Sequence, residues 1–308
     1  MNLSIKLGAL QGLFGKDQIE NFVKNQLSAG KDKYNEDCFF EALSEISILC
    51  FLCHIVWTKY IYEPVLNKSK SKKNPEARFE FEKGKYKYAV NVEVKSPAFP
   101  HNNHENQRII IPTVLLSEKG KKTFSEYCMN NGLELIWPRV LKIKDFLNSA
   151  SEKFIIPVEN EYNLLYINWS YSDFPSNSYL EAWSLMTNPI NGILTHPEYA
   201  KQIGINDDIF DKISAVIVYT ESLEGVMFQS FEHVWQNNSS GPRFRMWINN
   251  KMYNNSNSES SKISDLCNIT CMNPSPNASS FCMCDFKNDF SNYNPQELLK
   301  LIIDTSLK

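Results

Sequence analysis

Glu93 and Lys95 are the residues of this chain whose types and spacing are best suited to chemistry. They lie in the segment Tyr86–Ser96 (YKYAVNVEVKS), which the sequence predicts to be a buried β-strand. Because strand side chains alternate, Glu93 and Lys95 share one face while Val92 and Val94 point to the other. Burying a carboxylate and an ammonium in an apolar strand is costly, so the pair indicates a catalytic or metal-binding role. The competing interpretation is a plain ion pair on a surface strand.

A second carboxylate, Glu76, begins another predicted strand. Phe79 and Phe81 alternate with charged neighbours in that strand, and Gly84 supplies a turn before the strand of Glu93. We therefore expect an antiparallel hairpin that brings Glu76 and Glu93 together. Two such carboxylates can share a hard divalent cation such as Mg²⁺, which takes oxygen ligands and usually only one or two protein carboxylates.

A long, mostly buried helix is predicted around Cys38–Cys50 and extends a turn or two beyond it. Its apolar residues fall at helical spacing; they are Phe39, Leu43, Ile46, Cys50, Cys53 and Trp57. Glu45 lies amid this apolar run, upstream of both strands. Glu41, one turn earlier on the same side, is the alternative acid of this helix, although near the helix start it would also interact favourably with the helix dipole.

Pro75-Glu76, a spacer and Glu93-Val94-Lys95 resemble the signature of the PD-(D/E)XK nuclease superfamily, which has the restriction-endonuclease-like fold. Members of that family also tend to carry an acidic residue on a helix upstream of the motif, a place that Glu45 fits. The family's first motif position is most often Asp, whereas this chain has Glu76. Glu80, on the same strand, is the fallback ligand.

The resemblance implies a metal-dependent nuclease that hydrolyses phosphodiester bonds, with DNA expected in preference to RNA. Glu45, Glu76 and Glu93 would hold Mg²⁺ or Mn²⁺, and Lys95 would lie near the attacking water. One alternative is a non-catalytic module that binds nucleic acid or protein on a degenerate nuclease scaffold. Another is an unrelated α/β protein, in which the three carboxylates would lie far apart.

Further elements are predicted downstream of the motif. Strands are expected at Arg108–Leu116, Leu164–Trp169 and Ile213–Tyr219, and an amphipathic helix at Lys142–Phe154. This order predicts an α/β fold with a central mixed β-sheet flanked by helices. With the resemblance, which covers about residues 36–235 and has specific motif support in 41–95, it implies a restriction-endonuclease-like core with a small C-terminal extension. The helix lysines, Lys142, Lys144 and Lys153, are within reach of a bound phosphate in one interpretation and form a solvated face in the other, which is favoured.

The length of 308 residues allows one large domain with additions. We expect an N-terminal helical segment (1–35), a nuclease-like domain (36–248) and a C-terminal part (249–308). The last of these contains a cysteine-bearing loop and a helix at Pro295–Ile303, which has Pro at its first turn.

The formal net charge of −3 argues against a broadly basic nucleic-acid-binding protein. Leu66–Lys95 nevertheless holds nine basic residues against four acidic ones. Its first lysines, Lys68, Lys70, Lys72 and Lys73, would attract a phosphate backbone, unless they belong to a solvated loop. No run of about 18 apolar residues is present, so no membrane association is expected. The N-terminus shows no signal-peptide cleavage pattern, which makes the cytoplasm the default location.

The eight cysteines fall into two groups. Cys38, Cys50, Cys53 and Cys128 lie in apolar or helical surroundings and are expected to be small core residues. The polar C-terminal segment holds Cys267, Cys271, Cys282 and Cys284. Their spacing is compatible with a four-thiolate zinc site, with disulfides or with free thiols, and it favours free thiols because the paired Cys-x2-Cys pattern is missing. His101 and His104 are expected in a polar loop after the motif strand rather than in the site.

Overall fold

The structure is a computed structural model, which describes residues 3–27, 35–53, 58–66, 73–83, 85–97, 107–110, 118–136, 139–170, 179–188, 192–221 and 244–249. Its helices are α1 (Leu3–Phe14), α2 (Lys16–Asn25), α3 (Glu36–Cys53), α4 (Glu118–Asn130), α5 (Val140–Lys153), α6 (Tyr179–Thr187), α7 (Pro197–Gln202) and α8 (Ile209–Lys212). Its strands are β1 (Lys59–Tyr62), β2 (Ala77–Lys83), β3 (Tyr86–Lys95), β4 (Gln107–Ile110), β5 (Leu133–Ile136), β6 (Glu161–Asn168), β7 (Ala215–Tyr219) and β8 (Phe244–Ile248).

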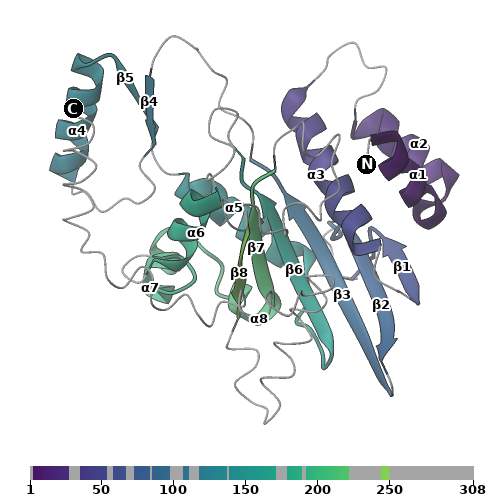
Figure 1. The fold of residues 1–308 in the computed structure, drawn as a ribbon. Coiled ribbons are helices and arrows are strands. Elements are labelled where there is room, and N and C mark those ends of the chain that lie inside the picture. Colours follow the sequence, from purple (N-terminus) through teal and green to yellow (C-terminus); the bar gives the residue numbers. More distant parts are fainter. Residues whose placement is uncertain are drawn as a thin grey trace, which may run out of the picture.

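Six strands form one open mixed sheet in the order β1-β2-β3-β6-β7-β8 (Figure 1). The first three are antiparallel neighbours, β3, β6 and β7 run parallel to one another, and β8 returns antiparallel at the far edge. Helices flank this sheet, so the predicted α/β class with a central mixed sheet is confirmed. β4 and β5 form a separate parallel pair beside α4.

The predicted hairpin of β2 and β3 is present, and its register follows the apolar pattern. Phe79 pairs with Val90, and Ala77 pairs with Val92. All four side chains belong to the core on the α3 side of the sheet. A shift of one residue would turn these side chains to the opposite face, so burial fixes the register. The register in turn fixes where Glu76 and Glu93 lie.

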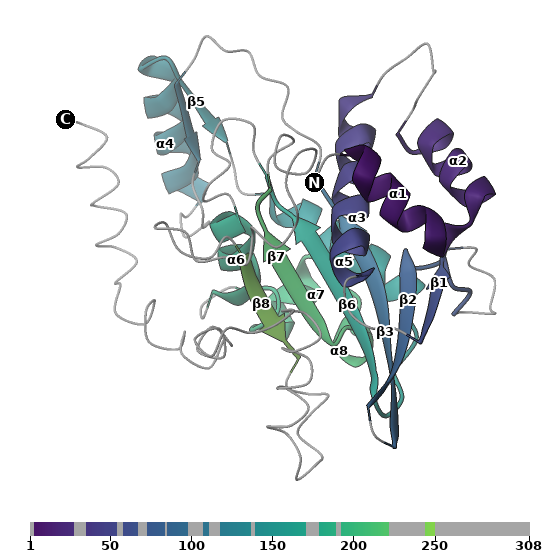
Figure 2. The same cartoon turned by 45° about the vertical axis from the view of Figure 1, so that its right-hand side comes forward.

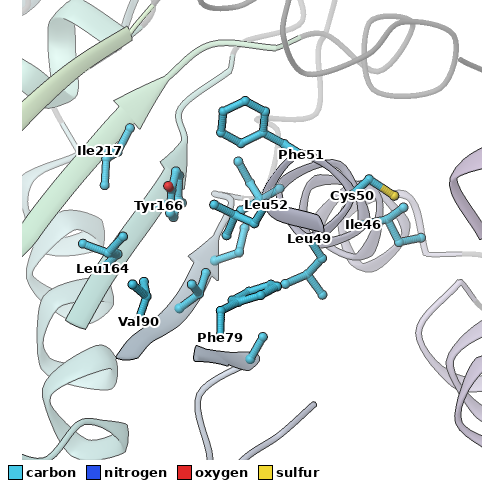
Figure 3. Packing of buried hydrophobic residues seen from close by; sticks show 14 of the residues in the cluster. Ile46, Leu49, Cys50, Phe51, Leu52, Phe79, Val90, Leu164, Tyr166 and Ile217 are labelled. Atoms are coloured by element: carbon cyan, nitrogen blue, oxygen red, sulfur yellow. The ribbon is translucent and has the colours of Figure 1, made fainter. Parts of the chain in front are cut away.

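The core on the first face of the sheet is formed with α3. Figure 3 shows Leu49 and Leu52 of this helix packed toward Phe79, Leu164 and Tyr166 of the strands. The N-terminal helices extend the same core, since Leu10, Phe14 and Phe22 are buried in it, and Figure 2 shows α1 beside α3.

The second face of the sheet is covered by α5 and the helices that follow it. Two residues of β6, Leu165 and Ile167, face this side of the sheet, as does Trp169, which follows the strand. They pack against Ile143, Phe146 and Leu147 of α5. Because residues of β6 alternate between the two cores, every residue of this strand is buried. The continuous apolar pattern of Leu164–Trp169 had predicted such a strand, and α5 coincides with the predicted amphipathic helix to within two residues.

Some expectations are wrong and others fall outside the described residues. Cys38, in the first turn of α3, is exposed rather than a core residue, whereas Phe40, two residues later, is buried in the core. Cys50 and Cys128 are buried and Cys53 is partly so, as predicted. Among the described helices, none is long and apolar enough to cross a membrane. Trp57, His101, His104, residues 250–308 with Cys267, Cys271, Cys282 and Cys284, and the lysines Lys68, Lys70 and Lys72 lie outside the described part of the chain.

Candidate active site

Three neighbouring strands bring three glutamates to one level of the sheet. Tyr62 pairs with Ala77, and Ala77 pairs with Val92, so the residues beside them lie in one row across the sheet. Backbone hydrogen bonds continue this row: the Glu63 N–H donates to the Glu76 carbonyl and the Glu76 N–H donates to the Val92 carbonyl, both over 2.9 Å. Glu93 follows Val92. We call Glu63, Glu76 and Glu93, together with Glu45 of α3, the carboxylate cluster.

Glu93 is the most deeply buried member of the carboxylate cluster, with no exposed side-chain surface. Burial raises its pKa to about 7, and the nearby charge of Glu76 acts in the same direction, while Lys95 and Lys153 oppose the rise. Its Oε1 accepts from both ammonium groups. Its Oε2 is buried and has no hydrogen-bond partner among the described residues. A buried carboxylate oxygen without a partner has the capacity to accept a further hydrogen bond or to bind a cation.

Lys95 stands beside Glu93, as the alternation of the strand predicted. Its Nζ lies 2.9 Å from Glu93 Oε1 and 3.9 Å from Glu41 Oε1. The side chain is 14% exposed. Lys95 is therefore partly buried, and it can still face a ligand that approaches from solvent.

Lys153 is one residue of the site that was not predicted from the sequence. It was expected on a solvated face, yet its side chain is 14% exposed, and its Nζ lies 2.6 Å from Glu93 Oε1 and 3.3 Å from Glu76 Oε1. Burial lowers the pKa of Lys153, but the charges of Glu76 and Glu93 outweigh burial and raise it overall. The signal was present in the spacing, because Lys153 follows the buried Phe146 and Ala150 by seven and three residues. Lys142 and Lys144 are partly exposed and contact Phe146 and Asp145 instead.

Glu45 supplies the acid of the preceding helix. It is 8% exposed, and Tyr62 Oη donates a hydrogen bond to its Oε1 over 3.2 Å. Burial raises the pKa of Glu45 well above its usual range, and the charges of Glu76, Glu93 and Glu63 add to the rise. Glu45 therefore lies close enough to the other carboxylates for their negative charges to raise its pKa.

Glu41 and Glu80, the two alternative acids, lie at different distances from the cluster. Glu41 is half-exposed and faces Lys95, so it borders the site. Glu80 is held by Arg78, with Nε 2.8 Å from Oε1, and by Lys59 at 3.7 Å. The charge of Arg78 and its hydrogen bond lower the pKa of Glu80. The structure does not bring Glu80 to Glu93, so it does not serve as the fallback ligand.

Glu63 is a further member of the carboxylate cluster that the sequence reasoning missed. It follows β1, a four-residue strand that was not predicted, although its composition, KYIY, ending just before Pro64, is typical of an edge strand. Partial burial raises the pKa of Glu63, Glu76 adds to the rise, and Lys153 opposes it. Its backbone φ is 45°, in the left-handed region that a glutamate rarely adopts.

A buried polar network holds the end of α5 that carries Lys153. Asn163 of β6 donates through Nδ2 to the carbonyls of Ile155 and Lys212, each over 2.7 Å. Its Oδ1 accepts from Asn91 of β3 over 2.7 Å. Asn91 lies two residues before Glu93 on the same face, so one network fixes both β3 and the chain that leaves α5.

The donor chemistry of the carboxylate cluster fits a hard divalent cation. Carboxylate oxygens are the ligands that Mg²⁺ and Mn²⁺ prefer, and Glu93 Oε2 is a buried oxygen without a hydrogen-bond partner in the described chain. Within the described ranges, however, no three His, Cys, Asp or Glu side chains are arranged to hold a metal ion as they stand. Lys153 instead bonds both Glu76 and Glu93.

Glu76 and Glu93 accept from one ammonium, so they lie within reach of one ion. The interpretation as an unrelated protein, in which these carboxylates would be far apart, is wrong on this point. Comparisons of the chain with protein-family models, with curated proteins and with solved structures each gave no match.

Proposed function

We propose that this protein is a metal-dependent nuclease that hydrolyses phosphodiester bonds, with DNA as the preferred substrate. The observation that carries the proposal is the convergence of Glu45 from α3, Glu93 and Lys95 from β3, and Glu76 from the position just before β2. Glu93 is fully buried among them with one unpartnered oxygen. Burial raises the pKa values of Glu45 and Glu93, and buried carboxylates perturbed in this way are characteristic of functional sites.

The resemblance of the Pro75-Glu76 and Glu93-Val94-Lys95 segments to the PD-(D/E)XK nucleases supports the same conclusion. The mixed sheet with helices on both faces, and the acid on the helix before the hairpin, agree with a restriction-endonuclease-like core. We propose that this core is the fold of the sheet domain.

Glu76 and Glu93 would hold Mg²⁺ or Mn²⁺, with Glu45 as a further ligand, directly or through water. Such an ion, when bound, supplies an activated water and offsets negative charge on the phosphate. Lys95 would donate a hydrogen bond to the attacking water and would balance charge that develops on the phosphoryl oxygens. Glu93 holds the Lys95 ammonium in that position through their 2.9 Å contact.

A cleavage assay tests this function. Wild-type protein, Lys95→Ala and Glu93→Ala would be incubated with double- and single-stranded DNA and with RNA, in Mg²⁺ and in Mn²⁺. We expect each substitution to lower the cleavage rate by at least about a hundredfold, because Glu93→Ala removes a proposed metal ligand and Lys95→Ala removes the ammonium that balances transition-state charge. Lys87→Ala and Glu82→Ala are matched controls, since this exposed pair lies at the other end of the same hairpin. Equal rates for wild type, Lys95→Ala and Glu93→Ala would end the nuclease proposal.

A second candidate function is a non-catalytic module that binds nucleic acid or protein on the same scaffold. The observation in its favour is the ammonium of Lys153, which already bonds Glu76 and Glu93. In such a module the Lys153 ammonium would permanently neutralise the negative charges of Glu76 and Glu93, as a metal ion does in a metal-dependent nuclease. Calorimetry with Mn²⁺ separates the two functions: binding that Glu93→Ala abolishes favours the nuclease, and no binding by the wild type favours the module.

A further inference from the structure

Lys153 holds the position that a divalent cation shared by Glu76 and Glu93 would need. Its Nζ lies 2.6 Å from one carboxylate and 3.3 Å from the other. A metal ion bound to the same two oxygens would stand close to this ammonium, and two positive charges at such separations repel strongly where water is scarce. Lys153 and the metal ion are therefore expected to compete.

Lys95 differs from Lys153 in the contacts it makes. It bonds Glu93 but not Glu76, and its second carboxylate neighbour is Glu41 on α3. Glu93 would thus keep one ammonium partner after Lys153 has left. Among the described residues Lys153 alone bridges Glu76 and Glu93, so it is the lysine whose displacement would open the position between the two carboxylates.

The surroundings of Lys153 allow its ammonium to move. The residue is the last of α5, and its side chain is a flexible four-carbon stem that retains some exposure. Glu63, which is exposed, lies close enough for its charge to interact with that of Lys153. Rotation of the stem can therefore carry the ammonium toward another carboxylate at the rim of the site.

We propose that Lys153 is an internal cation that competes with the divalent metal ion for Glu76 and Glu93, and that metal binding moves its ammonium off them. The inference rests on the proposed function, because it takes these two glutamates as metal ligands. Lys153 acts here as a positioning residue: it keeps the carboxylates together and balances their charge until the metal ion takes over.

The first test is calorimetry with Mn²⁺ on four proteins at one pH. Lys153→Met removes the competing charge and is expected to raise Mn²⁺ affinity at least about tenfold over the wild type. Lys153→Arg keeps a positive charge and is expected to bind no more tightly than the wild type. Lys144→Met makes the same substitution on the same helix, at a lysine that pairs with Asp145, and should match the wild type. Equal or weaker Mn²⁺ binding by Lys153→Met overturns the inference.

The second test uses the wild-type protein and does not depend on whether a variant folds. An amine-reactive ester would label the protein with and without saturating Mn²⁺, and mass spectrometry would compare Lys153 with Lys144. Release from the two carboxylates should speed the labelling of Lys153 several-fold, with Lys144 unchanged. Unchanged or slower labelling of Lys153 in Mn²⁺ contradicts its displacement.

The two proposals fail in different ways. If the wild type binds Mn²⁺ and cleaves DNA, but Lys153→Met binds Mn²⁺ no better, the inference about Lys153 is wrong and the nuclease stands. If neither the wild type nor Lys153→Met binds Mn²⁺, the proposal of a metal-dependent nuclease is wrong, and the proposed competition between Lys153 and the metal ion is wrong as well.

Discussion

Tyr62 Oη donates a hydrogen bond to Glu45 Oε1 over 3.2 Å, and this contact ties the helix acid to the edge strand β1. The ring of Tyr62 packs edge-on against Phe14 of α1, with 4.2 Å between the ring centroids. Packing against Phe14 therefore holds the ring in place, while the hydroxyl group donates its hydrogen bond to Glu45.

Tyr62→Phe should therefore weaken metal binding without unfolding the protein. Because the hydrogen bond favours the charged form of Glu45, its loss should lower Mn²⁺ affinity about three- to tenfold and stability by about 1 kcal/mol. Calorimetry and thermal unfolding measure the two effects. Tyr60→Phe is the matched control, since Tyr60 Oη is buried without a partner in the described chain and its removal should not destabilise the protein. Equal Mn²⁺ affinities for wild type and Tyr62→Phe would show that the hydroxyl does not support the site.

Glu63→Asn should raise stability and lower metal affinity together. Glu63 has φ 45°, and asparagine tolerates this region better, as Asn160 does at φ 61°. The expected gain is about 0.5 to 1 kcal/mol in the free energy of unfolding, measured by chemical denaturation. Loss of its negative charge should at the same time weaken Mn²⁺ binding. If stability rises and Mn²⁺ binding stays the same, Glu63 has no part in the metal site.

Asn163→Ala should strongly destabilise the protein. The amide donates to two backbone carbonyls, those of Ile155 and Lys212, which would lose their donor. We expect a loss of about 2 to 4 kcal/mol in the free energy of unfolding. Asn148→Ala is the control, because Asn148 bonds the Gly204 carbonyl at an exposed position and should cost less than about 1 kcal/mol. Similar losses for the two variants would show that burial of the network does not matter.

A buried pair away from the carboxylate cluster predicts a pH dependence of stability. Glu221, just after β7, accepts from Ser47 Oγ over 3.3 Å, and Lys6 Nζ donates to the same hydroxyl over 3.3 Å. Cys50 and Tyr219 lie close by. Burial raises the pKa of Glu221 from 4.5 to about 7, against the opposing effects of Lys6 and Ser47. A raised folded-state pKa gives stability that is fully present below about pH 4.5 and is lost as pH rises through about 7.

Glu221→Gln should lack this part of the pH dependence. The free energy of unfolding of the wild type relative to Glu221→Gln should fall between pH 4.5 and 7, by up to about 3 kcal/mol. Titratable groups that do not interact with Glu221 cancel in this difference. Glu82→Gln, at an exposed position paired with Lys87, should run parallel to the wild type. Parallel curves for Glu221→Gln as well would contradict the raised pKa.

Most of the elements that the sequence predicted have a long periodic pattern or a continuous apolar run. α3, α5, β6 and the hairpin of β2 and β3 have enough apolar residues at one spacing to mark both the element and its buried face. The meeting of Glu76 and Glu93 followed from the hairpin alone, because neighbouring strands fix their relative position. The short edge strands β1 (KYIY) and β8 (FRMWI) were not predicted, because each combines a basic residue with few apolar ones, whereas β7 (AVIVY) is equally short but apolar throughout and was predicted.

Lys153 and Glu63 could not be placed in the site from the sequence for a different reason. Their positions depend on where α5 and β1 pack, and packing is decided by contacts between segments far apart in the chain. The periodicity of α5 indicates that Lys153 faces the protein, but not that it faces Glu76 and Glu93. Tertiary packing, which local patterns do not encode, supplies this part of the site.

The parallel pairing of β3 with β6 has a consequence for how the molecule folds. β1, β2 and β3 are joined in sequence and can pair locally, whereas β6 reaches β3 only after a long crossover that includes α5. Closing such a crossover is slow, since its loss of chain entropy precedes the contacts that compensate for it. We therefore expect Glu76 and Glu93 to meet early in folding, and Lys153 to join them only in the late, rate-limiting step.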